Sequence, residues 1–106
     1  MVRSIVVPLD GSRTAERALP LAVAVATGAG ARLVLVRVVS EGDGAGAEAG
    51  ADTYLAGIRS RLELAGARAD AVVRGGEVVP AILAAAEDAE ADLVVLATHG
   101  RSGLGR

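Results

Sequence analysis

Apolar and polar residues alternate along the chain with two different periods, one typical of strands and one typical of helices. Short apolar runs rich in β-branched residues predict four strands, over Ser4–Leu9, Arg32–Val39, Ala69–Arg74 and Asp92–Ala97. Between these runs apolar residues return every three or four positions, which predicts three helices. A repeated strand–helix–strand order builds right-handed crossovers. The pattern therefore predicts a parallel sheet with helices on both faces.

Each predicted helix has one apolar face. The faces consist of Ala15, Leu19, Ala22, Val23 and Ala26 in the first helix, Leu55, Ile58, Leu62 and Ala65 in the second, and Val79, Ile82, Leu83 and Ala86 in the third. Gly66 is expected to end the second helix, and Pro80 is tolerated in the first turn of the third. Pro20 lies inside the first helix and is expected to kink it.

The strand order follows from how continuous each apolar run is. The first, second and fourth runs are continuous, as in strands buried on both faces, whereas Ala69–Arg74 alternates with polar or small residues and predicts an edge strand. We therefore predict a Rossmann-like, doubly wound α/β fold with strand order 3-2-1-4, in one domain over residues 1–106. Because so apolar a fourth strand is a hazard at a sheet edge, we expect the chain to be incomplete at its C-terminus, without a fifth strand.

Composition excludes several classes of function. The 106 residues carry a formal net charge of −2, contain no cysteine and have Tyr54 as their only aromatic residue. Aromatic stacking on single-stranded nucleic acid is disfavoured, and the net charge gives no attraction to nucleic acid or anionic membranes. The longest uncharged run, Ala18–Ala31, is too short to span a bilayer, and no targeting segment is visible. We expect a cytoplasmic protein without nucleic-acid or membrane partners.

Two loops lie at the carboxyl edge of the predicted sheet, where such folds bind ligands at the switch between strands one and four. Asp10 ends the first strand; either Asp10 or Ser12 caps the next helix, or Asp10 contacts a ligand such as sugar hydroxyls. After the second strand, the glycine-rich segment Ser40–Gly50 is either a passive linker or a flap over the site.

The segment ATHGRSGLGR, residues 97–106, follows the fourth strand. Its glycines, serine and arginines suit an anion nest, and the alternative is a flexible basic tail. His99 is the only histidine, and no metal-ligand pattern or nucleophile motif accompanies it. A place in the loop or on the surface is favoured over a catalytic role, and we predict no catalytic or metal-binding residue.

Three segments, IVVPLDGSRTAERAL (Ile5–Leu19), LVLVRVV (Leu33–Val39) and the stretch Gly75–Arg106, together resemble the universal stress protein family. The most specific part is DLVVLATHGRSGLGR. The resemblance implies a small cytoplasmic protein with a Rossmann-like sheet of order 3-2-1-4-5. Members of this family respond to stress and often dimerise through the fifth strand. One subgroup binds ATP and another does not.

The resemblance also implies the residues of an adenine-nucleotide site. Pro8, Leu9 and Asp10 match the segment that lines adenosine, and Val38 matches the strand residue whose backbone reads adenine. Ala97 takes the place of the first glycine of the ATP-binding pattern, and Gly100 is the second. The predicted phosphate loop also includes His99, Arg101, Ser102 and Gly103. The closing Gly-Ser/Thr pair would fall beyond Arg106, so we expect a weakened phosphate site with low occupancy by ATP, with or without a divalent cation.

Three functions follow from these residues. The first is a stress-response protein that binds ATP and turns it over slowly or not at all, since no general base or metal cluster is evident. The alternative is a stress-response module without nucleotide that forms a homodimer or higher oligomer through its exposed fourth strand. The third, less favoured, is a nucleotidyl-transfer or hydrolase enzyme on the same fold.

Overall fold

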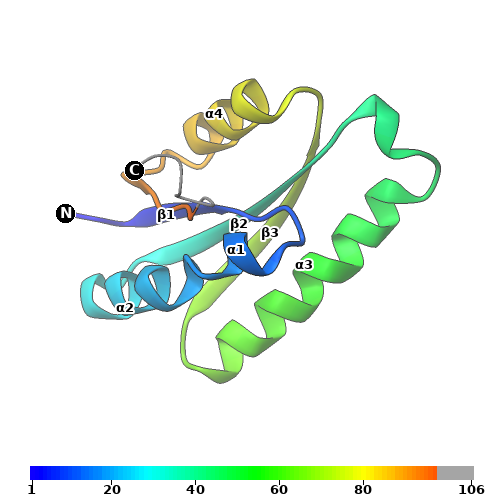
Figure 1. The fold of residues 1–106 in the computed structure, drawn as a ribbon. Helices are drawn as coiled ribbons and strands as arrows, with labels where there is room; N and C mark the ends of the chain where they lie inside the picture. The colour runs from blue at the N-terminus through cyan, green and yellow to red at the C-terminus, as the bar shows by residue number, and fades with distance from the viewer. Residues whose placement is uncertain (98–106) are drawn as a thin grey trace, which may run out of the picture.

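Strands and helices alternate along residues 1–97, the part of the chain that the computed structural model describes (Figure 1). In chain order the elements are β1 (Ser4–Pro8), α1 (Arg13–Glu16), α2 (Leu19–Ala29), β2 (Arg32–Val39), the 3₁₀ helix η1 (Glu41–Asp43), α3 (Ala47–Leu64), β3 (Arg68–Gly75), α4 (Val78–Asp88) and β4 (Leu93–Val94). The predicted α/β fold is confirmed.

All strands are parallel, and their order is β3-β2-β1-β4, as predicted. β1 pairs with β2 from Ser4↔Arg32 to Pro8↔Val36, and β3 pairs with the whole of β2 at the sheet edge. Helices α2 and α3 cover one face and α4 covers the other (Figure 1). The chain therefore changes face between β1 and β4, which places the topological switch there.

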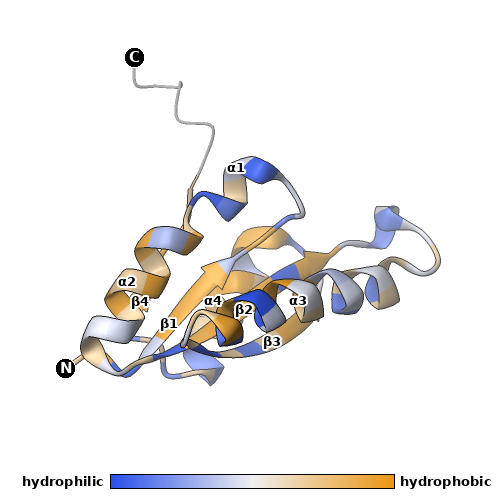
Figure 2. Cartoon of the chain, turned by 90° about the horizontal axis from the view of Figure 1, so that it is seen from below, coloured by the Kyte–Doolittle hydropathy of each residue, from blue (hydrophilic) through white to orange (hydrophobic). Residues whose placement is uncertain are grey.

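Successive side chains of a strand point to opposite faces of a sheet, and both faces of β1 and β2 are buried. Side chains such as Ile5 and Leu35 pack beneath α2 and α3 around the fully buried Leu55. Val6 and Val36 alternate with them and pack against Ala85 of α4. The strands are the most hydrophobic part of the molecule, and polar residues lie in α1 and along α3 (Figure 2). Continuous apolar runs thus mark these two strands correctly.

The predicted first helix is divided in two. The Ser12 hydroxyl accepts a hydrogen bond from the Ala15 N–H at 3.1 Å and so begins α1, which ends at Glu16. Pro20 lies in the first turn of α2, and as a proline it has no N–H to donate to the Glu16 carbonyl. The expected kink is therefore a break between two helices, although the predicted apolar face does point into the core.

Half of the face predicted for the third helix is confirmed, because Ile82 and Ala86 are partly buried and Ala86 packs against the core, and the other half is wrong. In α4, Val79 and Leu83 are 65% and 63% exposed, whereas Ala81 and Ala85 are buried against the sheet. Alanine and larger apolar residues occur around the whole helix, so periodicity alone does not select a side. Small alanine side chains let the helix backbone approach the strands closely.

The fourth strand is shorter than predicted and is not buried on both faces. Only Leu93–Val94 form β4, with both side chains exposed, and Leu96 is 55% exposed. Backbone hydrogen bonds from Asp92 to Ser4 and from Val95 to Val6 continue the pairing with β1. Within residues 1–97 this run has a neighbouring strand on one side only, which limits its burial.

The segment Ser40–Gly50, expected to be a passive linker or a flap, contains the 3₁₀ helix η1 and the beginning of α3. The Ser40 N–H donates to the Asp43 carboxylate at 2.7 Å within η1, and α3 already begins at Ala47. Helix α3 buries Leu55, Ile58 and Leu62 as predicted and ends before Gly66, which has φ +93°. Ala65, predicted on the buried face, is the exposed C-cap.

Candidate functional site

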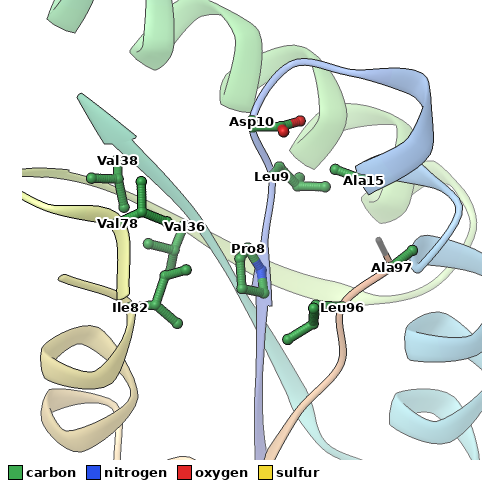
Figure 3. A pocket seen from close by; sticks show the side chains of 10 residues that line it. All are labelled: Pro8, Leu9, Asp10, Ala15, Val36, Val38, Val78, Ile82, Leu96 and Ala97. Carbon is green, nitrogen blue, oxygen red and sulfur yellow. The ribbon is translucent and has the colours of Figure 1, made fainter. Parts of the chain in front are cut away.

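A cleft of about 260 Å³ opens at the carboxyl edge of the sheet, where the chain changes face (Figure 3). The ends of β1 and β2, the first turns of α1 and α4, and the segment after β4 surround it. Its lining consists of Pro8, Leu9, Asp10, Ala15, Val36, Val38, Val78, Ile82, Leu96 and Ala97. The walls are thus aliphatic, and within residues 1–97 Asp10 is the only charged residue that lines the cleft.

Sequence and structure agree on half of this lining. Pro8, Leu9, Asp10, Val38 and Ala97 all lie in the cleft. The other predicted site residues, His99, Gly100, Arg101, Ser102 and Gly103, lie outside the described residues. Segments far apart in the sequence therefore meet at one place, as the switch-point rule predicts.

Five lining residues were missed by sequence reasoning: Ala15, Val36, Val78, Ile82 and Leu96. Two signals in the sequence point to some of them. Val36 lies two positions before Val38 and therefore faces the same side of β2. Val78 begins the helix that follows β3, and in a parallel sheet each such helix starts at the carboxyl edge.

The sequence left open whether Asp10 or Ser12 caps the first helix. Ser12 caps α1, while the Asp10 carboxylate accepts a hydrogen bond from the Ser12 N–H at 2.9 Å. Hydrogen bonding with Ser12, and to a lesser degree the nearby Arg37 guanidinium, lowers the pKa of Asp10 below its ordinary value of 3.8, against partial desolvation. An ionised carboxylate therefore lies exposed at the rim of an apolar cleft, where it can accept hydrogen bonds from hydroxyl groups.

Val38 lies two residues beyond the last pair between β1 and β2, Pro8↔Val36. The Leu9 N–H still donates to the Val36 carbonyl at 2.8 Å, after which the two chains separate. The edge of β2 that faces β1 is consequently outside the β1–β2 ladder at Val38. A backbone edge beside aliphatic walls suits a planar ligand with polar edges.

Residues 1–97 were also considered for a metal site and for a membrane-spanning helix. In this part of the chain no three His, Asp or Glu side chains are grouped so that they could hold a metal ion. None of its helices combines the length and the apolar character needed to cross a membrane.

A doubly wound parallel sheet with an apolar cleft at its switch point defines a Rossmann-like α/β domain of the kind that binds small ligands at this edge. The profile of the universal stress protein family matches residues 1–106, and the chain belongs to that family.

Solved structures of similar proteins agree with this assignment. A universal stress protein from Burkholderia pseudomallei is 32% identical over 93% of this chain and 83% of its own, with a TM-score of 0.78. A universal stress protein in complex with cAMP is 26% identical over 97% and 78%, with a TM-score of 0.80. A protein from Mycobacterium tuberculosis is 28% identical over 97% and 76%, with a TM-score of 0.75. A search among curated proteins gave no match.

Proposed function

We propose that this universal stress protein acts in the stress response by binding an adenine nucleotide, ATP in particular, in the cleft beside Asp10. The observation that carries the proposal is the convergence of Pro8–Asp10, Val38 and Ala97 on one apolar cleft. The family resemblance associates Pro8–Asp10 with adenosine, Val38 with adenine, and Ala97 with the first glycine of the ATP-binding pattern. The cAMP complex of a 26% identical relative supports an adenine nucleotide as the ligand class.

Different residues of the cleft suit the base and the sugar of a nucleotide. Val36, Val38 and Ile82 offer aliphatic contact to a base, and the Asp10 carboxylate accepts hydrogen bonds from ribose hydroxyls. A volume of about 260 Å³ is just below the roughly 300–1,000 Å³ of pockets that enclose a drug-sized ligand. The cleft therefore takes the base and sugar, and the phosphates lie outside it; Gly100 and Ser102, beyond the described residues, belong to the proposed phosphate loop.

ATP binding can be tested with two variants of neighbouring residues on α4. Ile82 lines the cleft, whereas Leu83 is exposed and outside it. A carboxylate at position 82 removes apolar contact and repels the phosphates, so Ile82→Glu is expected to weaken ATP binding at least about tenfold, that is by about 1.4 kcal/mol. Leu83→Glu adds the same charge one residue away and should bind ATP like the wild type.

The measurement is a calorimetric titration of each protein with ATP. If the wild type binds no ATP, or if both variants lose binding equally, the proposed site is wrong. A cytoplasmic location, slow hydrolysis and a bound divalent cation belong to the same proposal as secondary features.

The exposed apolar residues of β4, Leu93 and Val94, favour a second candidate function, self-association through this strand. Among residues 1–97, β4 pairs with β1 alone, and we expect its outer edge to pair with a second copy. Sedimentation at high micromolar concentration should then show a homodimer or larger species, and a monomer would rule this function out.

A further inference from the structure

Arg37 lies on the face of the sheet that α3 covers, opposite the part of the cleft between β2 and α4. Its neighbours in β2, Val36 and Val38, point towards α4 and line the cleft, so Arg37 points towards α3. There its guanidinium carbon is 5.4 Å from the centre of the Tyr54 ring, within the range of a cation–π contact. The contact joins the end of β2 to the middle of α3.

The same guanidinium also packs against the loop that carries Asp10. A Cβ placed on Gly11 would be 2.5 Å from the Arg37 Nη1 atom, so the arginine uses the space that a side chain would fill. Gly11 has φ +88°, a conformation that glycine adopts without strain. Arg37 is thus packed between the Asp10 loop and the Tyr54 ring.

Tyr54 is itself held in place. Its hydroxyl donates to the Glu16 carboxylate at 2.5 Å, and the other Glu16 oxygen is 3.9 Å from the Arg61 guanidinium. Desolvation, together with the Glu16 charge and hydrogen bond, raises the pKa of the Tyr54 hydroxyl, which keeps it a neutral donor. Arg37, Tyr54 and Glu16 form a set of contacts from α3 to the loop, which we call the α3 brace.

We propose that Arg37 is a positioning residue for the ligand site: with Tyr54, it holds the Asp10 loop in its binding geometry from the α3 face of the sheet. The inference rests on the proposed function for the identity of the ligand and on the packing described above for the brace. Two consequences follow. First, loss of Arg37 weakens nucleotide binding without removing any residue that lines the cleft. Second, a substitution at Asp10 changes the environment of the Tyr54 ring.

The second consequence can be measured without nucleotide. Because Tyr54 is the only aromatic residue of the chain, ¹³C-labelled tyrosine gives the NMR signals of this one ring. Asp10→Asn removes the charge and keeps an acceptor oxygen for the Ser12 N–H, and it should shift the Tyr54 ring signals in the wild-type background. In an Arg37→Gln background the same shift should fall to less than half.

Arg59→Gln is the matched control, because it makes the same substitution within α3, where the Arg59 guanidinium pairs with Glu63 at 3.2 Å and not with a residue of the brace. The Asp10→Asn shift should keep its full size in that background. A shift of equal size with and without Arg37, or no shift in the wild type, would overturn the inference.

The first consequence is measured by ATP titration. A cation–π contact of about 0.5–1 kcal/mol corresponds to a two- to fivefold weaker affinity for Arg37→Gln, while Arg59→Gln should equal the wild type. If Arg37→Gln does not fold, Tyr54→Leu replaces it as the test variant. This variant removes the aromatic ring and keeps the Arg37 charge, and it should show the same two- to fivefold loss of ATP affinity. Unchanged affinity overturns the brace and leaves the proposed function standing. A wild type that binds no ATP refutes the proposed function, and the NMR comparison still decides on the brace.

Discussion

Removing the Asp10 carboxylate should cost the protein most of its nucleotide affinity and little of its stability. Hydrogen bonds to a charged group contribute about 1.5–3 kcal/mol, so losing those from Asp10 to ribose hydroxyls weakens binding about 10- to 150-fold in Asp10→Ala. Asp10→Asn keeps a neutral acceptor and should lie between this variant and the wild type. The comparison separates the charge from the hydrogen-bond geometry.

The structural cost of Asp10→Ala is small, because Asp10 is exposed and its hydrogen bond within residues 1–97 is the one from the Ser12 N–H, at 2.9 Å. A hydrogen bond contributes about 0.5–1.5 kcal/mol to stability, and exposure favours the lower end of this range. Ser12 still caps α1 in the variant. The protein therefore stays folded, and its loss of affinity reports on the site.

Calorimetric titration with ATP is the assay, and Asp52→Ala, at an exposed aspartate of α3, is the control for loss of a negative charge. The lowered pKa of Asp10 keeps its carboxylate ionised well above 3.8, so its contribution to affinity should be constant between about pH 5 and 8 and decline only below 3.8. If Asp10→Ala binds ATP as tightly as Asp52→Ala, the carboxylate is not part of the site and the reasoning from the cleft fails.

Two further predictions concern stability. Leu55→Ala empties a fully buried position of α3 and should destabilise the fold by about 2–5 kcal/mol, seen as a large fall in Tm by circular dichroism; Leu64→Ala, at an 89% exposed position of the same helix, should leave Tm nearly unchanged. Asp92 accepts hydrogen bonds from the Arg3 and Ser4 N–H groups, which lower its pKa, so its stabilisation is present above pH 3.8 and lost as pH falls through the lowered value. Asp92→Asn should therefore lower the urea midpoint at neutral pH more than at acidic pH; equal effects at both would contradict this account.

The sequence predicts the fold well where a strand is buried on both faces. β1 and β2 are continuous apolar runs, and the parallel order follows from them together with the alternating edge strand β3. It predicts the fold poorly where apolar residues are more numerous than the surface that buries them. In α4, Val79 and Leu83 are as apolar as the buried positions, and only the fit of small alanines against the strands decides which side faces inwards. The run after Asp92 is apolar too, yet its burial depends on neighbours that its own sequence does not specify.

The candidate site divides in the same way. A residue at a strand end, such as Asp10, is predictable because topology brings the carboxyl ends of parallel strands to one edge, whereas Val38 was expected from the family resemblance. Ile82 lines the cleft from α4 because of where this helix crosses the sheet, and the periodicity of apolar residues does not predict that position. The contact between Arg37 and Tyr54 joins a strand to a helix through side-chain packing alone, and no motif in the sequence marks it.

The end of β2 shows why the cleft and the brace belong together. Alternation along one strand directs Val36 and Val38 to the cleft and Arg37 to α3. The cleft and the brace therefore share one short stretch of β2. Any shift of this strand end that widens the cleft also moves the guanidinium relative to Gly11 and the Tyr54 ring. A ligand that orders Asp10 and Val38 must therefore favour the position of Arg37 in which the brace is closed, and by reciprocity a closed brace must favour the ligand. Contacts on α3 can thus influence affinity in the cleft although α3 contributes no residue to its lining.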